Sequence, residues 1–242
     1  MCHPWLAAGV SGFLAIVIVR EVVPVLRASA TSDAWPQSGL LGIELRRWFR
    51  NRTRPLADVA LAGGLTANGV TLLQLVPSLG CALAYARGWL FTAGWLLIAS
   101  GTLDVLDGEM ARRDGRNGSH GAFIDSMVDR YGEAIVFAGL VALYRKEWML
   151  WLVLSAWVGG FLVSYVRARA ESLGVECREG LLQRPERYVI LGGASMVDSL
   201  VRHFTCDPAG GHSLLTAGIG LLAVLANVTA AQRIHGTWQR LA

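Results

Sequence analysis

Charge is scarce in this sequence. Charged side chains make up 17% of the 242 residues and hydrophobic ones 53%, whereas an average soluble domain is roughly 25% charged. Lysine is almost absent: Lys146 is the only one, so arginine carries nearly all of the positive charge behind the net +4. The arginines interrupt apolar stretches and do not gather in one patch. This argues against nucleic acid as a partner and favours a lipid bilayer and anionic substrates.

Cysteine and histidine patterns of the kind that bind zinc or form disulfides are also missing. The four cysteines show no CxxC spacing, so no disulfide framework is expected. The five histidines are scattered along the chain, which indicates surface or packing roles instead of a zinc site.

The first 39 residues are expected to form an N-terminal extension, with a linker over 31–39. Residues 5–26 are apolar, and Ala28-Ser29-Ala30 resembles a signal-peptidase site. No Lys or Arg precedes the apolar run, which argues against a secretory signal. An extra membrane helix or interfacial anchor is favoured, and an over-long start is the alternative.

Residues 40–242 are expected to form a single all-α integral membrane domain of about six transmembrane helices. Its first segment, Leu40 to Ala62, mixes apolar residues with five arginines. This pattern predicts an amphipathic helix on the cytoplasmic leaflet, with an ordinary juxtamembrane loop as the alternative. The six spans are expected near 67–86, 89–112, 121–143, 147–172, 185–203 and 213–234. Arginine density places the richer side in the cytoplasm of a multi-pass inner-membrane protein.

Four aspartates dominate the polar chemistry. Asp104 and Asp107 are three residues apart, and Asp125 and Asp129 are four apart, so each pair lies on one face of a helix. Carboxylates at the edge of a bilayer are costly unless they are neutralised, and four of them favour divalent cations. Gly108 and Gly121 leave room for a ligand. The alternative is an acidic loop between helices.

These residues spell DxxDGxxAR, then eight residues, then GxxxDxxxD. The pattern resembles the signature of the CDP-alcohol phosphatidyltransferase family at every fixed position. The resemblance implies two divalent ions, Mg²⁺ or Mn²⁺, held by Asp104, Asp107, Asp125 and Asp129. It also implies that Asp129 is the catalytic base and that Gly108 and Arg112 contact CDP. Family members are often homodimers.

A Gly-Leu-Thr stretch precedes the first expected span. Thr66 is a good N-cap candidate. The family carries a similar stretch, in which Asn68 and Thr71 would contact the nucleotide. Ala67 stands where the family usually has proline. Helix capping alone is the alternative.

Three arginines recur near the ends of later expected helices. Arg167, Arg187 and Arg233 could bind an anion, since arginine suits phosphate, although the positive-inside rule explains them without any ligand. Their surroundings are similar to those in phosphatidylinositol and archaetidylinositol phosphate synthases, which implies that they bind the acceptor phosphate.

The resulting expectation is an enzyme of phospholipid biosynthesis. It would transfer a phosphatidyl group from CDP-diacylglycerol to inositol phosphate, a phosphorylated polyol, and release CMP. Glycerol 3-phosphate is the alternative acceptor. An ion-coupled transporter or non-catalytic scaffold is the alternative of a different class.

Overall fold

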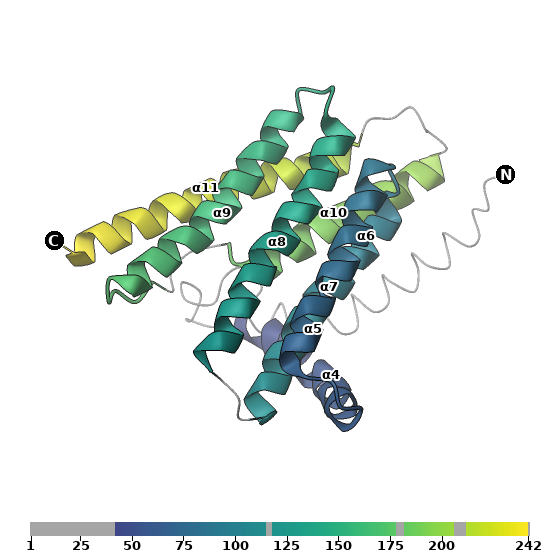
Figure 1. Ribbon diagram of the computed structural model, residues 1–242. Coiled ribbons are helices and arrows are strands. Elements are labelled where there is room, and N and C mark those ends of the chain that lie inside the picture. Colours follow the sequence, from purple (N-terminus) through teal and green to yellow (C-terminus); the bar gives the residue numbers. More distant parts are fainter. Residues whose placement is uncertain (1–41, 115–117, 178–181, 206–211, 242) are drawn as a thin grey trace. The chain divides into compact units, whose positions relative to one another are not determined.

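The computed structural model describes residues 42–114, 118–177, 182–205 and 212–241, and these contain helices and no strand (Figure 1). The expected extension over 1–39 lies outside the described residues. The helices are α4 (Gly42–Ala62), α5 (Ala67–Leu73), α6 (Leu75–Ala86), α7 (Leu90–Asp114), α8 (Ser119–Tyr144), α9 (Leu150–Ser172), α10 (Arg184–Thr205) and α11 (Ser213–Leu241).

The chain divides into two compact units. Residues 46–145 form one, which we call the acidic unit, and it includes most of α4 together with α5 to α8. Residues 146–242, grouped with 1–45, form the C-terminal unit, which includes α9, α10 and α11. The four motif aspartates fall in the first unit and the three arginines of interest in the second.

The first expected span, 67–86, is a helix with an interruption at Gln74. Pro77 has no backbone N–H, so the carbonyl of Leu73 lacks its usual helical donor. The backbone N–H of Gln74 is shared between the carbonyls of Val70 and Thr71, both 3.2 Å away. The helix therefore ends as α5 and resumes at once as α6.

Within the acidic unit, α6 packs against both α7 and α8, and α5 packs against α7. Small residues allow this close approach. A Cβ added to Gly139 on α8 would lie 2.5 Å from the backbone of Ala82 on α6. Ser78 on α6 hydrogen-bonds Ser100 on α7 across a buried interface, at 3.0 Å. The helix α4 joins this unit through an apolar cluster in which Ala57 meets α5 and α7.

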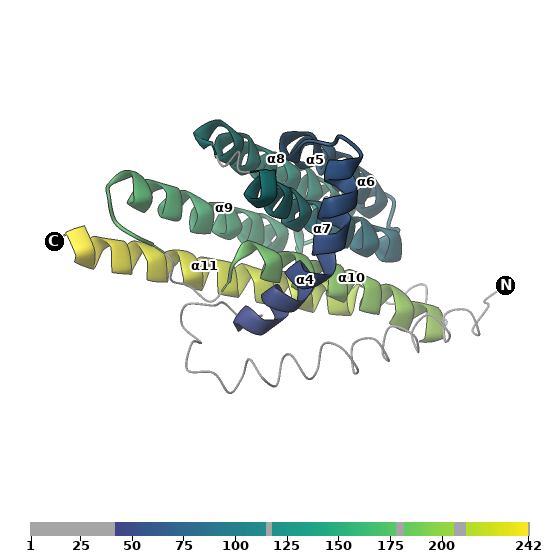
Figure 2. The same ribbon diagram turned by 90° about the horizontal axis from the view of Figure 1, so that it is seen from below.

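Within the C-terminal unit, α11 packs against α9 and α10, as Figure 2 shows. The buried carboxylate of Asp198 on α10 accepts the N–H groups of Leu214 and Leu215, at 2.9 and 3.2 Å. These are the unsatisfied donors at the start of α11, so Asp198 caps that helix from its neighbour. The Thr229 hydroxyl accepts the N–H of Leu182 at 3.2 Å, which fixes the segment before α10.

Four described stretches are long and apolar enough to span a bilayer, and all four coincide with predicted spans. They are Ala67–Ala86, Leu90–Asp114, Leu150–Ser172 and Ser213–Leu241. The other two predicted spans are helical as α8 and α10, but α8 carries two motif aspartates and α10 carries Arg187 and Asp198, which lower their apolar content. The count of six spans therefore stays a prediction.

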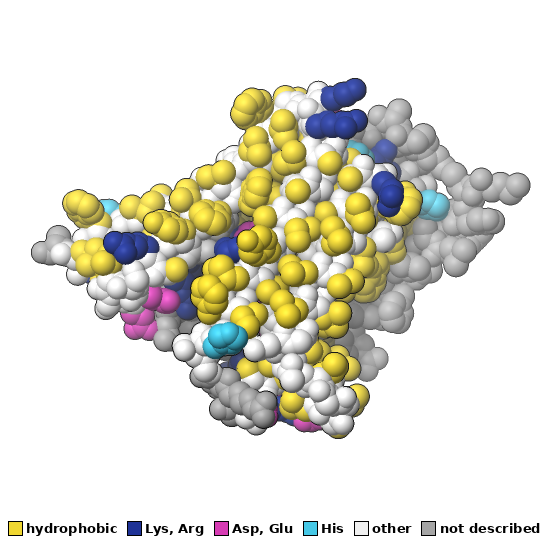
Figure 3. Space-filling model, viewed as in Figure 1, with side chains coloured by type: hydrophobic (Ala, Val, Ile, Leu, Met, Phe, Trp, Pro, Cys, Tyr) yellow, Lys and Arg dark blue, Asp and Glu magenta, His cyan; other side chains and the backbone are white. Residues whose placement is uncertain are grey.

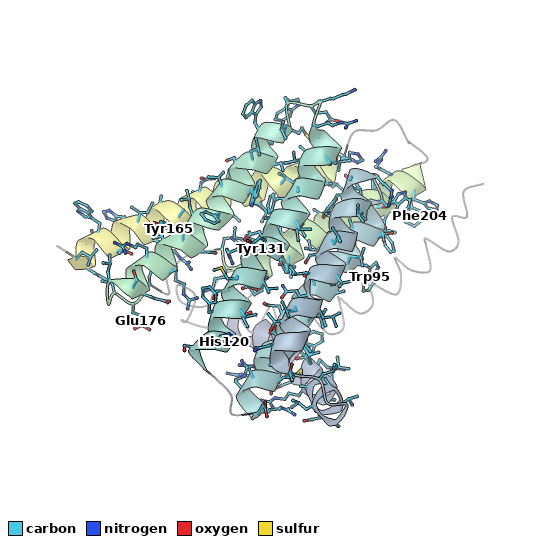
Figure 4. All side chains as sticks on the ribbon, viewed as in Figure 1. Trp95, His120, Tyr131, Tyr165, Glu176 and Phe204 are labelled. Atoms are coloured by element: carbon cyan, nitrogen blue, oxygen red, sulfur yellow. The ribbon has the colours of Figure 1, made fainter. Side chains whose placement is uncertain are left out.

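Hydrophobic side chains cover much of the surface, over α6 and α8 in one unit and over α9 in the other (Figure 3). Trp95 and Tyr131, labelled in Figure 4, are 46% and 66% exposed. An exposed apolar surface of this extent marks an interaction surface, and on helices of this length it is typical of a membrane protein.

We predict that Gly139→Ala destabilises the protein, because the new methyl group would collide with the α6 backbone and not with a movable side chain. Overpacking of this kind costs about 2 kcal/mol. Thermal unfolding in detergent measures it. Gly193→Ala on α10 is the matched control, since a Cβ there meets nothing within 4 Å. Equal melting temperatures for the two variants would contradict the prediction.

Candidate functional site

Three of the four predicted aspartates come together. Carboxylate oxygens of Asp104 and Asp107 on α7 and of Asp125 on α8 all lie within 4.8 Å of one another. The i, i+3 spacing presents the first two from the same face of α7, and α8 supplies the third. Carboxylates this close repel one another unless a cation or a proton compensates them.

The donor set fits a divalent cation. Asp107 is 4% exposed, and its Oδ2 accepts no hydrogen bond from the residues that the structure describes. A buried carboxylate oxygen without a donor is costly, and a hard cation with oxygen ligands would satisfy it. Asp129 lies one helical turn beyond Asp125 and is half-buried. It is outside the group of three, so its predicted roles stay predictions.

A pocket of roughly 430 Å³ adjoins these acids within the acidic unit. Its wall contains Asp107, Asp125 and all four residues predicted to bind CDP, together with Gly121. The full lining is Thr66, Ala67, Asn68, Thr71, Asp107, Gly108, Ala111, Arg112, Asp114, Gly118, Ser119, Gly121, Ala122 and Asp125. The pocket therefore joins anion-binding and cation-binding groups in one cavity.

At the start of α5, one residue caps the helix and two others line the pocket. Thr66 is the N-cap, and its hydroxyl accepts the N–H of Gly69 at 3.1 Å. The turn before it needs Gly64, whose φ of 79° is in the left-handed region that glycine adopts without steric cost. Asn68 and Thr71 line the pocket, so capping does not account for either of them.

At two positions of the pocket wall, glycine leaves space that a side chain would fill. A Cβ added to Gly121 would lie 3.4 Å from Oδ1 of Asn68, and one added to Gly108 would lie 3.5 Å from Nη1 of Arg112. The side chains of Asn68 and Arg112 thus lie over bare backbone. His120, labelled in Figure 4, is the second residue of α8 and precedes Gly121. It is exposed and is not among the pocket residues.

In the C-terminal unit, the three predicted arginines also gather. Arg233 on α11 lies within electrostatic range of Arg167 on α9 and Arg187 on α10. Nη1 of Arg187 donates to the carbonyl of Gly160 at 2.7 Å, and Nη1 of Arg233 donates to that of Val163 at 2.6 Å. Arg187 and Arg233 are 5% and 4% exposed. Burying cations beside each other is unfavourable without an anion, and Glu171, paired with Arg167 at 2.8 Å, supplies one negative charge.

The long apolar helices are typical of a membrane protein. Within it, a carboxylate cluster lies beside a pocket that an arginine also lines, an arrangement suited to divalent ions and a phosphorylated ligand. Residues 64–199 match the family model for CDP-alcohol phosphatidyltransferases. The chain belongs to that family and is an enzyme, which decides against the transporter and scaffold alternatives. The family uses divalent metal ions.

Two similar proteins, one of them with two crystal structures, narrow the comparison. The chain is 37% identical to an archaetidylinositol phosphate synthase of Methanothermobacter thermautotrophicus over 198 residues, covering 82% of this chain and 94% of that protein. Crystal structures of a phosphatidylinositol phosphate synthase of Mycobacterium tuberculosis, one with CDP-DAG bound and one in complex with manganese and citrate, match at 32% identity with a TM-score of 0.67. Both matches cover 77% of this chain, with 93% and 88% of the solved chains.

One residue of the site was missed by sequence reasoning. Glu109 occupies a variable position of the motif, yet its carboxylate is buried and contacts Arg112 and Arg113 at 2.8 and 3.2 Å. The signal was present, because residues three and four apart on a helix face one another. Asp114 and Ser119 also line the pocket, but no pattern in the sequence distinguished them.

We predict that the purified protein binds Mn²⁺ and that Asp107→Asn weakens this binding by about tenfold or more, because a charged oxygen ligand is lost. Electron paramagnetic resonance of free Mn²⁺ measures the binding without any turnover. Glu147→Gln is the control, since it removes an exposed carboxylate outside the cluster. Unchanged Mn²⁺ affinity in Asp107→Asn would exclude this residue as a ligand.

Proposed function

We propose that this enzyme transfers the phosphatidyl group of CDP-diacylglycerol to a hydroxyl of inositol phosphate and releases CMP. The observation that carries the choice of a phosphorylated acceptor is the cluster of Arg167, Arg187 and Arg233. Three helices each contribute one guanidinium group to it. Such a cluster suits a phosphate monoester, which carries more negative charge than a diester and accepts several charge-assisted hydrogen bonds. The similarity to inositol phosphate lipid synthases supports inositol over glycerol.

The carbonyl contacts of two arginines support this assignment. Arg187 and Arg233 each use one nitrogen to hold a carbonyl of α9, so their guanidinium planes are fixed before a ligand arrives. An arginine held in place loses less entropy when it binds than a freely rotating one. The positive-inside rule explains arginines at helix ends, but it does not require them to be buried beside one another.

The nucleotide half of the donor is assigned to the pocket of the acidic unit. Asn68 and Thr71 would contact the cytidine end, and Gly108 and Arg112 would support the diphosphate. Asp104, Asp107, Asp125 and Asp129 would hold two divalent ions, Mg²⁺ or Mn²⁺. When bound, these ions supply positive charge that stabilises the diphosphate and the leaving CMP.

The attacking group is the acceptor hydroxyl, and its target is the β-phosphorus of the donor. Asp129 is assigned as the base that accepts the hydroxyl proton. Half-burial at the end of the acidic cluster suits that role, since a base must reach the acceptor while staying beside the other carboxylates. The arginines are assigned to hold the acceptor by its phosphate.

The membrane setting follows from the substrate. A CDP headgroup is water-soluble and its acyl chains are not, so a site at the ends of spanning helices holds both. We place all six predicted helices in the inner membrane, the active site on the cytoplasmic side, and residues 40–242 in one transferase domain that forms a homodimer. On α4, Arg52 lies 5.5 Å from the ring of Trp48. Interfacial helices pair basic and aromatic residues in this way, which supports its placement on the leaflet.

The expected result of an acceptor screen is CMP release from CDP-diacylglycerol with inositol phosphate, and little with free inositol, because the arginine cluster needs a phosphate. The purified protein is assayed in detergent with Mg²⁺ or Mn²⁺ present. CMP release with glycerol 3-phosphate alone would overturn the inositol assignment while leaving the transferase chemistry intact.

Two variants test whether the arginine cluster is what binds the acceptor phosphate. Arg187→Ala removes a buried member, and we expect the KM for the phosphorylated acceptor to rise by about tenfold or more, as for a lost charge-assisted hydrogen bond. Arg169→Ala is the matched control. It lies two residues from Arg167 and contacts Ser172, so the acceptor KM is expected to stay unchanged.

The role of Asp129 is tested by Asp129→Asn. We expect turnover to fall by about 10³-fold or more, because an amide cannot accept the hydroxyl proton, while binding of CDP stays within a few fold. Titration calorimetry with CDP and a CMP-release assay measure the two properties separately. Full turnover in this variant would remove Asp129 from the role of base.

A further inference from the structure

The carboxylate of Glu109 contacts three arginines within the acidic unit. Its Oε2 accepts Nη2 of Arg112 at 2.8 Å. Its Oε1 lies 3.2 Å from Nε of Arg113 and 3.6 Å from Nε of Arg54. The Glu109 side chain is 8% exposed, so these contacts are made largely out of water, where charge-assisted bonds are strong.

The two carboxylate oxygens of Glu109 contact different arginines. Oε2 holds the arginine that lines the pocket, and Oε1 holds two arginines outside the pocket lining. Arg113 also pairs with Asp58 on α4. One carboxylate thus joins the pocket to the helix α4, with Arg54 and Asp58 as the residues on the α4 side.

The orientation of Arg112 follows from this contact. One terminal nitrogen, Nη2, is held by Glu109, while the other, Nη1, lies 3.5 Å from the point where a Cβ on Gly108 would be. Gly108 lines the pocket, so Nη1 is directed to the pocket side. An arginine fixed at one edge presents its other edge to an anion at a lower entropic cost.

We propose that Glu109 is a positioning residue that holds Arg112 against the diphosphate of the nucleotide, and that it links this arginine to α4 through Arg54. The proposal rests on the function proposed above, because it assumes a cytidine diphosphate ligand in this pocket. Glu109 itself does not line the pocket and acts only through Arg112.

Glu109→Gln tests this role because it removes the negative charge. Even an amide oxygen that still faces Arg112 would hold it only by a weaker hydrogen bond to a neutral acceptor. We expect Glu109→Gln to weaken CDP binding about tenfold, the loss typical of one charge-assisted hydrogen bond. The KM for CDP-diacylglycerol should rise in parallel, with the acceptor KM and kcat within twofold of wild type.

The experiment uses the full-length protein in detergent with Mg²⁺, and CDP binding is measured by titration calorimetry on the folded fraction. Asp58→Asn is the control. It removes the exposed partner of Arg113 without touching Arg112, and CDP affinity is expected to match wild type. Glu109→Asp keeps both oxygens on a shorter side chain and should recover part of the affinity.

A double-mutant cycle decides whether Glu109 acts through Arg112. If it does, Glu109→Gln combined with Arg112→Ala binds CDP no more weakly than Arg112→Ala alone. Additive losses would show a general structural role and overturn the proposal, as would wild-type CDP affinity in Glu109→Gln. Wild-type protein that binds no CDP would instead refute the proposed function, so the two failures are distinguishable.

Discussion

The mutual repulsion of Asp104, Asp107 and Asp125 is the constraint on which the site depends. Their oxygens lie within 4.8 Å of one another, and two of the three are on α7, a helix otherwise apolar enough to span a bilayer. Bound cations stabilise such a group of carboxylates, and the same cations can then bind the negative charge of a diphosphate. The glycines at 108 and 121 and the nearby arginines support this arrangement.

Much of this arrangement could be predicted from the sequence, because it depends on local spacing. Asp104 and Asp107 share a helix face by periodicity alone, and the apolar runs define most helices by length. The break between α5 and α6 was missed, although Pro77 indicates it. The predicted spans at α8 and α10 are helical, but they are not among the four stretches apolar enough to span, because they carry polar residues such as Asp198.

The remaining features depend on tertiary contacts that no local pattern contains. Sequence spacing left Arg167, Arg187 and Arg233 open between topology and ligand binding, and only the packing of α9, α10 and α11 brings them together. Glu109 is similar. Its spacing to Arg112 and Arg113 is visible in the sequence, but its contact with Arg54 requires α4 to pack beside α7. The burial that gives these pairs their strength cannot be deduced from neighbours in the chain.

The two units use arginine in different ways, and the difference follows from what holds each side chain. Arg187 and Arg233 each donate to a backbone carbonyl of α9, an acceptor that carries only partial charge. Arg112 is anchored on the full charge of Glu109, which fixes its direction but offsets part of its charge. Where carboxylates bind cations, those cations already supply positive charge to a diphosphate, so the arginine contributes mainly a directed hydrogen bond. A phosphate monoester bound away from such cations depends on the positive charge of the arginines themselves. The anchoring groups therefore match the ligand that we assign to each unit.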